Sequence, residues 1–94
     1  MPVPEVNLPN LLRSHAGGQR SVRVEGATIA EVLETLQGEY PGLSGQLVTS
    51  EGDLHRFVNV YLNDDDVRYM EKLDTKVQPD DTVSILPAVA GGAQ

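Results

Sequence analysis

One amphipathic helix constrains the fold of this chain more than any other feature of its sequence. Thr28 and Glu31 have the spacing of a capping box, in which the Thr28 hydroxyl accepts from the Glu31 amide and the Glu31 carboxylate reaches back to the Thr28 amide. Apolar residues follow at the spacing of one helical face: Ile29, Val32, Leu33, Leu36 and Tyr40. Pro41-Gly42 ends the predicted helix. Other elements must cover its apolar stripe, and strands are the only candidates.

Short segments with alternating or β-branched residues predict those strands. We expect extended chain over residues 2–8, 20–25, 57–62, 67–69 and 82–86. The first two strands should form a hairpin through the loop that contains Gly17-Gly18, and Asn63–Asp66 should form a tight acidic turn. Short helical turns are predicted over residues 9–13 and 43–48.

This order of elements predicts one two-layer α+β domain. The single amphipathic helix should lie on one face of a mixed sheet, because only the sheet offers a surface that can bury its stripe. Pairing of the first and last strands in the middle of the sheet would give the β-grasp arrangement. The periodicity of the sequence does not by itself decide this strand order. With 94 residues, the chain should form one domain rather than two.

The charge of the chain narrows the choice of partners. Fourteen acidic residues against seven basic ones give a formal net charge of −7. Nucleic-acid binding depends on neutralising phosphates with Lys and Arg, so we expect no nucleic-acid partner. The acidity favours partners with basic docking surfaces, which Asp64–Asp66 could steer, although a need for solubility would explain the same charge equally well.

The chain contains no cysteine, which excludes disulfides, thiolate metal sites and a cysteine nucleophile. This absence fits a reducing compartment. The N-terminus has no basic segment followed by an apolar run, and no stretch is long enough to span a membrane. We therefore expect a cytoplasmic protein that has no membrane partner and is monomeric when free.

Three features inside the folded part could suggest chemistry, and none is predicted to carry it. His15 lies in a glycine loop and His55 lies beside Arg56 before a predicted strand, so structural or solvated roles are favoured. Asp64–Asp66 lacks the glycine and the distal glutamate of a calcium loop. Gly17-Gly18 lacks the lysine and the following helix of a phosphate loop. We expect no catalytic residue, no metal site and no bound cofactor.

The C-terminal segment is a slim apolar thread that follows the last strand directly. Pro87 has no amide hydrogen for a central ladder, so it should end the strand or lie at a sheet edge. Residues 88–94 have no large side chain except Val89 and Gln94, and such a segment cannot bury enough surface to fold. We therefore divide the chain into a folded domain over residues 1–87 and a flexible tail over 88–94, which contains Gly91-Gly92.

A resemblance to a known family is carried by three segments: Val83–Gly92, Leu54–Arg68 and Leu8–Arg13. They resemble the ubiquitin-like sulfur-carrier proteins, the family that contains the small subunit of molybdopterin synthase, the thiamine sulfur carrier and the thiocarboxylate carrier of cysteine biosynthesis. Val83–Gly92 resembles the end of these carriers, and Leu54–Arg68 resembles their central strand, hairpin and return. Leu8–Arg13 is most similar to the cysteine-biosynthesis carrier. The resemblance covers nearly the whole chain and implies their ubiquitin-like β-grasp fold.

The resemblance implies that the tail carries the function. A ubiquitin-activating-type enzyme would adenylate Gly92 with ATP, and a thiocarboxylate formed there would donate sulfur. Gly91 and Gly92 have no β-carbon, so the thread could enter a narrow active-site tunnel. Active carriers of this family end at the second glycine, whereas Ala93-Gln94 follow here. These two residues are a proform extension, disable the protein or were added by cloning. We favour a proform that a JAMM-type zinc metalloprotease trims between Gly92 and Ala93.

The resemblance also implies partners for sulfur transfer. The nearest use is cysteine formation by a pyridoxal-phosphate-dependent synthase. Alternatives are sulfur carriage for molybdopterin or thiolated natural products, and conjugation to lysines as a ubiquitin-like modifier. The candidates for docking lie beside the tail or in it: Phe57, Leu86, Ala88, Val89 and Ala90. For Phe57 and Leu86, an ordinary place in the core is nearly as well supported.

Overall fold

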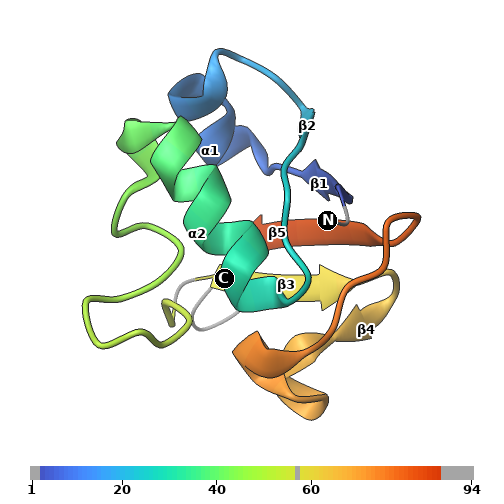
Figure 1. The fold of residues 1–94 in the computed structure, drawn as a ribbon. Helices are drawn as coiled ribbons and strands as arrows, with labels where there is room; N and C mark the ends of the chain where they lie inside the picture. Colours follow the sequence, from blue (N-terminus) through green and yellow to red (C-terminus); the bar gives the residue numbers. More distant parts are fainter. Residues whose placement is uncertain (1–2, 57, 88–94) are drawn as a thin grey trace.

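The computed structural model describes residues 3–56 and 58–87 and shows a sheet with a helix across one face (Figure 1). The strands are β1 (Glu5–Asn7), β2 (Ser21–Arg23), β3 (Val58–Leu62), β4 (Asp65–Asp66) and β5 (Thr82–Pro87). The helices in this part of the chain are α1 (Asn10–Arg13) and α2 (Ile29–Glu39), with short 3-10 turns η1 (Ser14–Ala16), η2 (Pro41–Leu43), η3 (Val67–Tyr69) and η4 (Lys72–Asp74). The main helix, α2, lies where the periodicity predicts it.

The sheet has the strand order β2-β1-β5-β3-β4. β1 and β5 are parallel, with Val6 opposite Val83, whereas the other pairs of neighbouring strands are antiparallel. The first and last strands therefore pair inside the sheet, with the predicted hairpin partner β2 at one edge. This arrangement is the β-grasp fold, so the predicted α+β fold class is confirmed.

The core lies between α2 and the sheet. The apolar stripe of α2 is fully buried at Ile29, Val32, Leu33 and Leu36, each 0% exposed. These side chains belong to one cluster with the inward residues of the central strands, which include Val6, Val60, Val83 and Ile85. Burial of one such side chain contributes roughly 1.5–3 kcal/mol, so the stripe is a principal source of stability. Tyr40, the last residue of the predicted stripe, is only half buried, and its hydroxyl accepts from Nε2 of Gln19 at 2.9 Å.

The N-terminus of α2 has the predicted cap with one change of partner. The Thr28 hydroxyl accepts from the Glu31 amide at 3.2 Å, as expected. Oε1 of Glu31 accepts from the amide of Ala27 at 2.9 Å, and not from that of Thr28. The carbonyl of Ala27 accepts from the amide of Val77 at 2.9 Å, which holds residue 27 against the segment that precedes β5. In this position, the amide of Ala27 lies within reach of Glu31.

The connection after α2 differs from the prediction. Residues 44–48 form no helix; the 3-10 turn η2 begins earlier than predicted, at Pro41, and ends at Leu43, because the fixed φ of proline suits the first position of a helical turn. Oε1 of Gln37 then accepts from the amides of Leu47 and Val48, each at 3.2 Å. The segment after η2 is thus held to α2 by a side chain and does not extend the helix.

The strand ends also differ from the prediction. The return strand after the acidic turn is Asp65–Asp66, and not residues 67–69. Oδ1 of Asp66 accepts from the Arg68 amide at 2.8 Å, and this cap begins η3 where a strand was predicted. β1 and β2 are shorter than predicted, although the bond from the Leu8 amide to the Arg20 carbonyl, 2.8 Å, continues their pairing.

Candidate functional site

The tail follows β5, a strand from the interior of the sheet. β5 pairs with β3 from Val83 to Pro87, and Pro87 lies opposite Val58. β1 pairs only with Thr82–Ser84, so β5 has an open side at Pro87. A proline is tolerated at such an edge because no neighbouring strand needs its amide hydrogen. The open side agrees with the prediction that Pro87 ends the strand or lies at a sheet edge, and the pairing with Val58 holds the root of the tail to the sheet.

Most predicted site residues lie outside the described residues: Phe57, Ala88, Val89, Ala90, Gly91, Gly92 and Ala93. Leu86 is the predicted docking residue that the structure does describe. Its side chain is 45% exposed, whereas that of its neighbour Ile85 is 1% exposed. The alternative that placed Leu86 in the core is therefore wrong, and its role in docking stays a prediction.

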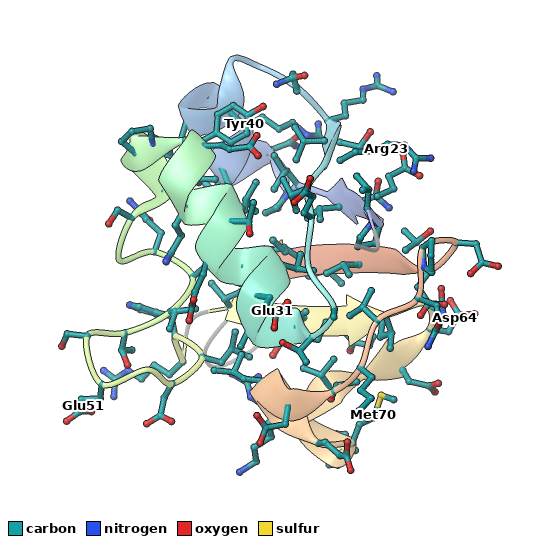
Figure 2. The ribbon with its side chains drawn as sticks, in the orientation of Figure 1. Arg23, Glu31, Tyr40, Glu51, Asp64 and Met70 are labelled. Carbon is teal, nitrogen blue, oxygen red and sulfur yellow. The ribbon has the colours of Figure 1, made fainter. Side chains whose placement is uncertain are left out.

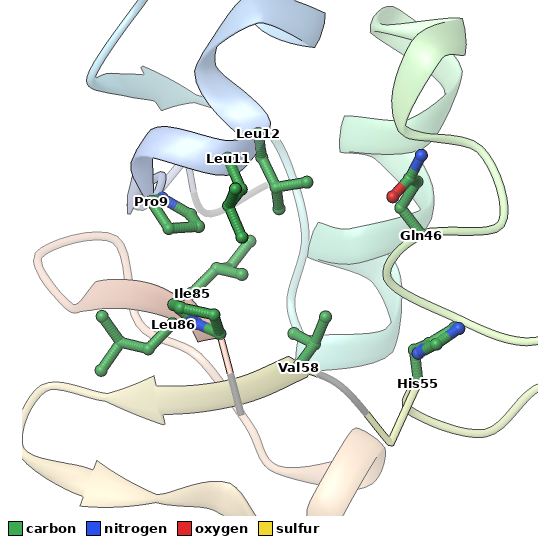
Figure 3. Close-up of a pocket in the computed structure, with 9 residues that line it drawn as sticks. Pro9, Leu11, Leu12, Gln46, His55, Val58, Ile85 and Leu86 are labelled. Carbon is green, nitrogen blue, oxygen red and sulfur yellow. The ribbon is translucent and has the colours of Figure 1, made fainter. Parts of the chain in front are cut away.

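An apolar pocket of about 360 Å³ lies at this end of β5 (Figure 3). It is lined by Pro9, Leu11, Leu12, Gln46, His55, Val58, Ile85, Leu86 and Pro87. In Figure 3, Gln46 and His55 lie across the pocket from Pro9 and Leu11. Since Pro87 is part of the wall, the pocket opens beside the root of the tail.

The helix α1 is part of this site, although the sequence did not predict it there. Leu12 is buried, at 8% exposed, but the Leu11 side chain next to it is 71% exposed. The signal was the leucine pair itself, because successive residues of a helix point in different directions and a single turn cannot bury both on one side. That α1 and β5 line one pocket could not be predicted, since the two elements lie near opposite ends of the chain.

The acidic turn lies at the other end of the sheet from this pocket. Asp64 lies beyond the end of β3 (Figure 2), where Leu62 pairs with Val83 near the start of β5. Pro87 is further along β5 by about 13 Å, at roughly 3.3 Å per residue. Asp64–Asp66 therefore do not border the root of the tail, and any steering by them would act at the far end of the domain.

The described residues form an apolar pocket and no cluster of metal ligands. Among residues 3–56 and 58–87, no group of three or more His, Cys, Asp or Glu could hold a metal ion. His55 lines the pocket, and His15 lies against Gly42, with Nδ1 3.0 Å from where a Cβ of residue 42 would stand. Within the same residues, no helix has the length and apolar character needed to cross a membrane.

Comparison with known proteins places the chain in a family. A sequence profile of the ThiS family matches residues 6–92, from β1 to the second glycine of the tail. The chain belongs to the ThiS family. The predicted resemblance to ubiquitin-like sulfur carriers is thereby confirmed.

This ThiS-family chain is 49% identical over 89 residues to the sulfur carrier protein CysO of Mycobacterium tuberculosis. The aligned residues cover 93% of this chain and 96% of that protein. It is 40% identical over 78 residues to small archaeal modifier protein 3 of Haloferax volcanii, and the aligned residues cover 80% of this chain and 84% of that protein. A chain in the crystal structure of the Amycolatopsis orientalis BexX/CysO complex superposes with a TM-score of 0.85 at 46% identity, covering 94% of this chain and 98% of that one. These relatives are named as carriers and modifiers, which agrees with the prediction that the chain is not an enzyme.

Proposed function

We propose that this chain is a sulfur carrier whose Gly92 carboxylate is converted to a thiocarboxylate. The observation that carries the proposal is the ThiS-family match, which ends on the glycine that would bear the sulfur. The similarity to a Mycobacterium tuberculosis protein named as a sulfur carrier supports it.

The proposed chemistry takes place in an activating enzyme of the ubiquitin-activating type, because a free carboxylate is a poor electrophile. A carboxylate oxygen of Gly92 bonds to the α-phosphorus of ATP, and pyrophosphate leaves. The sulfur of a donor then attacks the carbonyl carbon of Gly92, and AMP leaves with the electrons of the broken C–O bond. ATP is a substrate of that enzyme, and this chain needs no cofactor of its own.

The fold suits this use of the tail. Pro87 is fixed by its pairing with β3, so the folded domain can dock while the residues beyond it reach into the enzyme. The five residues from Ala88 to Gly92 span at most about 18 Å when fully extended. The reacting carboxylate must therefore lie within that distance of the pocket beside Pro87.

Removal of Ala93-Gln94 must precede activation in this scheme. The terminal carboxylate of the uncut chain belongs to Gln94, whereas the carboxyl of Gly92 is held in a peptide bond. Hydrolysis of the Gly92–Ala93 bond frees it, and a JAMM-type zinc metalloprotease is the proposed enzyme. The end of the family match at Gly92 supports this position for the cut.

Cysteine formation by a pyridoxal-phosphate-dependent synthase is the proposed destination of the sulfur. The similarity to a CysO protein supports this choice, and thiolated natural products and molybdopterin are the alternatives. The second candidate function is conjugation to lysines, which the 40% identity to a protein named as an archaeal modifier favours.

Two forms of the protein test the proposal, one ending at Gln94 and one at Gly92. Each is incubated with the activating enzyme of the same organism, ATP and sulfide, and its mass is measured. The form ending at Gly92 should gain the difference between sulfur and oxygen, and the longer form should not change. Equal activation of both forms would contradict trimming, and lysine adducts alone would favour the modifier function. Failure of the shorter form to be adenylated would refute the carrier function.

A further inference from the structure

The pocket beside Pro87 has no charged side chain, although the chain as a whole is strongly acidic. The formal net charge of the chain is −7, yet none of the residues lining this pocket is an Asp, Glu, Lys or Arg. Seven of its nine lining residues are apolar, and only Gln46 and His55 are polar. A charged group entering the pocket would lose hydration without gaining a counter-charge. The pocket therefore favours an uncharged occupant with an apolar side chain.

Two exposed leucines form part of the wall of this pocket. Leu11 of α1 is 71% exposed, and Leu86 of β5 is 45% exposed. The side chain of Leu11 points toward Ile85 of β5 (Figure 3). An occupant that covered the two leucines would remove their apolar surface from water, which is favourable.

The direction of β5 leads the next residues of the chain to this pocket. Side chains of an extended segment alternate between its two faces, so Ile85, Pro87 and residue 89 share a face if the chain continues without a turn. Ile85 is 1% exposed, and both Ile85 and Pro87 line the pocket. Residue 89 is a valine, and it follows Pro87 by about 7 Å at roughly 3.3 Å per residue. An extended continuation of β5 thus directs Val89 to the side of the pocket.

The composition of the tail also selects Val89. Residues 88–93 carry no charge, and Val89 has the one side chain among them that is larger than a methyl group. A segment joined to the wall of the pocket reaches it at a high effective concentration, whereas a second copy of the chain must first associate. Val89 lies outside the described residues, so the inference depends on the pocket and on the spacing of residues along the chain.

We propose that the pocket binds Val89 of the protein's own tail when the protein is free. Burial of a valine side chain and the ordering of residues 88 and 89 are free energies of similar size and opposite sign. A docked and a released form of the tail are therefore both populated. An enzyme that takes up the tail must compete with the pocket for Val89. The inference concerns the protein alone and does not depend on the proposed sulfur chemistry.

Methyl NMR of the protein alone tests this binding. Leucine and valine methyl groups are labelled in the full chain and in the form ending at Gly92. A nuclear Overhauser effect should connect the methyl groups of Val89 with those of Leu11 or Leu12 in both forms. Leu11 is the informative partner, because it is distant from the tail in sequence and lines the pocket.

Matched variants of the tail identify the side chain that is bound. Val89→Ser and Ala90→Ser each introduce one hydroxyl group, but only Val89→Ser removes a large apolar side chain. Val89→Ser should shift the methyl signals of Leu11, whereas Ala90→Ser should leave them as in the unaltered protein. Val89→Ile adds one methylene group and should raise the ratio of docked to released tail about two- to fourfold. The fold is kept in each variant, since residues 89 and 90 lie beyond β5.

The inference is wrong if no Overhauser effect connects Val89 with Leu11 or Leu12, or if Val89→Ser leaves the Leu11 signals unchanged. It is also wrong if the effect grows with protein concentration, because a second copy would then occupy the pocket. Thiocarboxylate formation is measured separately on the form ending at Gly92. Its failure would refute the carrier function and leave the binding of Val89 intact, whereas a protein that forms the thiocarboxylate without the Overhauser effect would show the reverse.

Discussion

Gly26 lies directly against Val32. A Cβ atom at Gly26 would stand 2.6 Å from the backbone nitrogen of Val32 and 2.7 Å from its Cγ2. Gly26 is buried in the segment that joins β2 to α2, and Val32 is a fully buried residue of α2. The backbone of this connection therefore touches the helix, an approach that a residue with a side chain cannot make.

Replacing Gly26 with alanine should lower the free energy of unfolding by about 1–3 kcal/mol, as is typical of an overpacked core. The closest atom is backbone, so it cannot rotate out of the way, and the connection must shift from the helix. Chemical denaturation followed by circular dichroism measures the change.

The matched control is Gly38→Ala in α2. A Cβ atom there would meet no atom within 4 Å, and alanine favours a helix over glycine by roughly 0.5–1 kcal/mol. This variant should therefore be more stable than the unaltered protein. Destabilisation by Gly38→Ala, or none by Gly26→Ala, would contradict the packing described for these two glycines.

The cap of α2 predicts a loss of stability for Thr28→Ala. This change removes the hydroxyl that accepts from the Glu31 amide, and loss of such a cap costs about 0.5–2 kcal/mol. Thr35→Ala is the control, because it makes the same change inside the same helix, where alanine is the better helix former. If denaturation shows that both variants lose equal stability, the cap is not the cause.

Gln37 should stabilise the position of the segment that follows η2. Its Oε1 accepts from two backbone amides, those of Leu47 and Val48, and the Leu47 side chain is 0% exposed. Gln37→Met keeps the size of the side chain but leaves both donors without this acceptor, which should cost about 1–3 kcal/mol. Hydrogen exchange should become faster at these two amides. Gln37→Glu retains an acceptor and should lose less free energy of unfolding. An equal loss in both variants would contradict this explanation.

The helix and the hydroxyl that caps it could be predicted because their signals are local. The stripe from Ile29 to Leu36 and the hydroxyl of Thr28 need only neighbouring residues to be understood. Strand order is different, since it brings Val6 opposite Val83 across most of the chain. Alternation of side chains shows which face of a strand is buried but not which strand lies beside it. The resemblance to a known family supplied the strand order that periodicity could not.

In the candidate site, too, local features could be predicted from the sequence and long-range ones could not. Gly91-Gly92 could be identified from the sequence, because the motif is contiguous and follows a strand. The pocket could not, because its wall combines Leu11 of α1 with Leu86 of β5. The exposure of Leu86 could be predicted from the alternation within β5. Ile85 beside it faces the core, and successive residues of a strand face opposite sides.

The tail should require a small residue before Gly92. In the form that ends at Gly92, Gly91→Val should lower kcat/KM for thiocarboxylate formation by about tenfold or more, because a branched side chain obstructs a narrow channel and restricts the backbone angles next to the reacting carboxyl. The unfolding midpoint should not change, since residue 91 lies beyond β5. Gly38→Ala serves as the control, because it changes a glycine of α2 and should leave the rate of transfer unaltered. Mass spectrometry of samples quenched during the initial phase gives the rate. If Gly91→Val reacts at the rate of the unaltered form, the tail does not have to pass through a channel that excludes side chains.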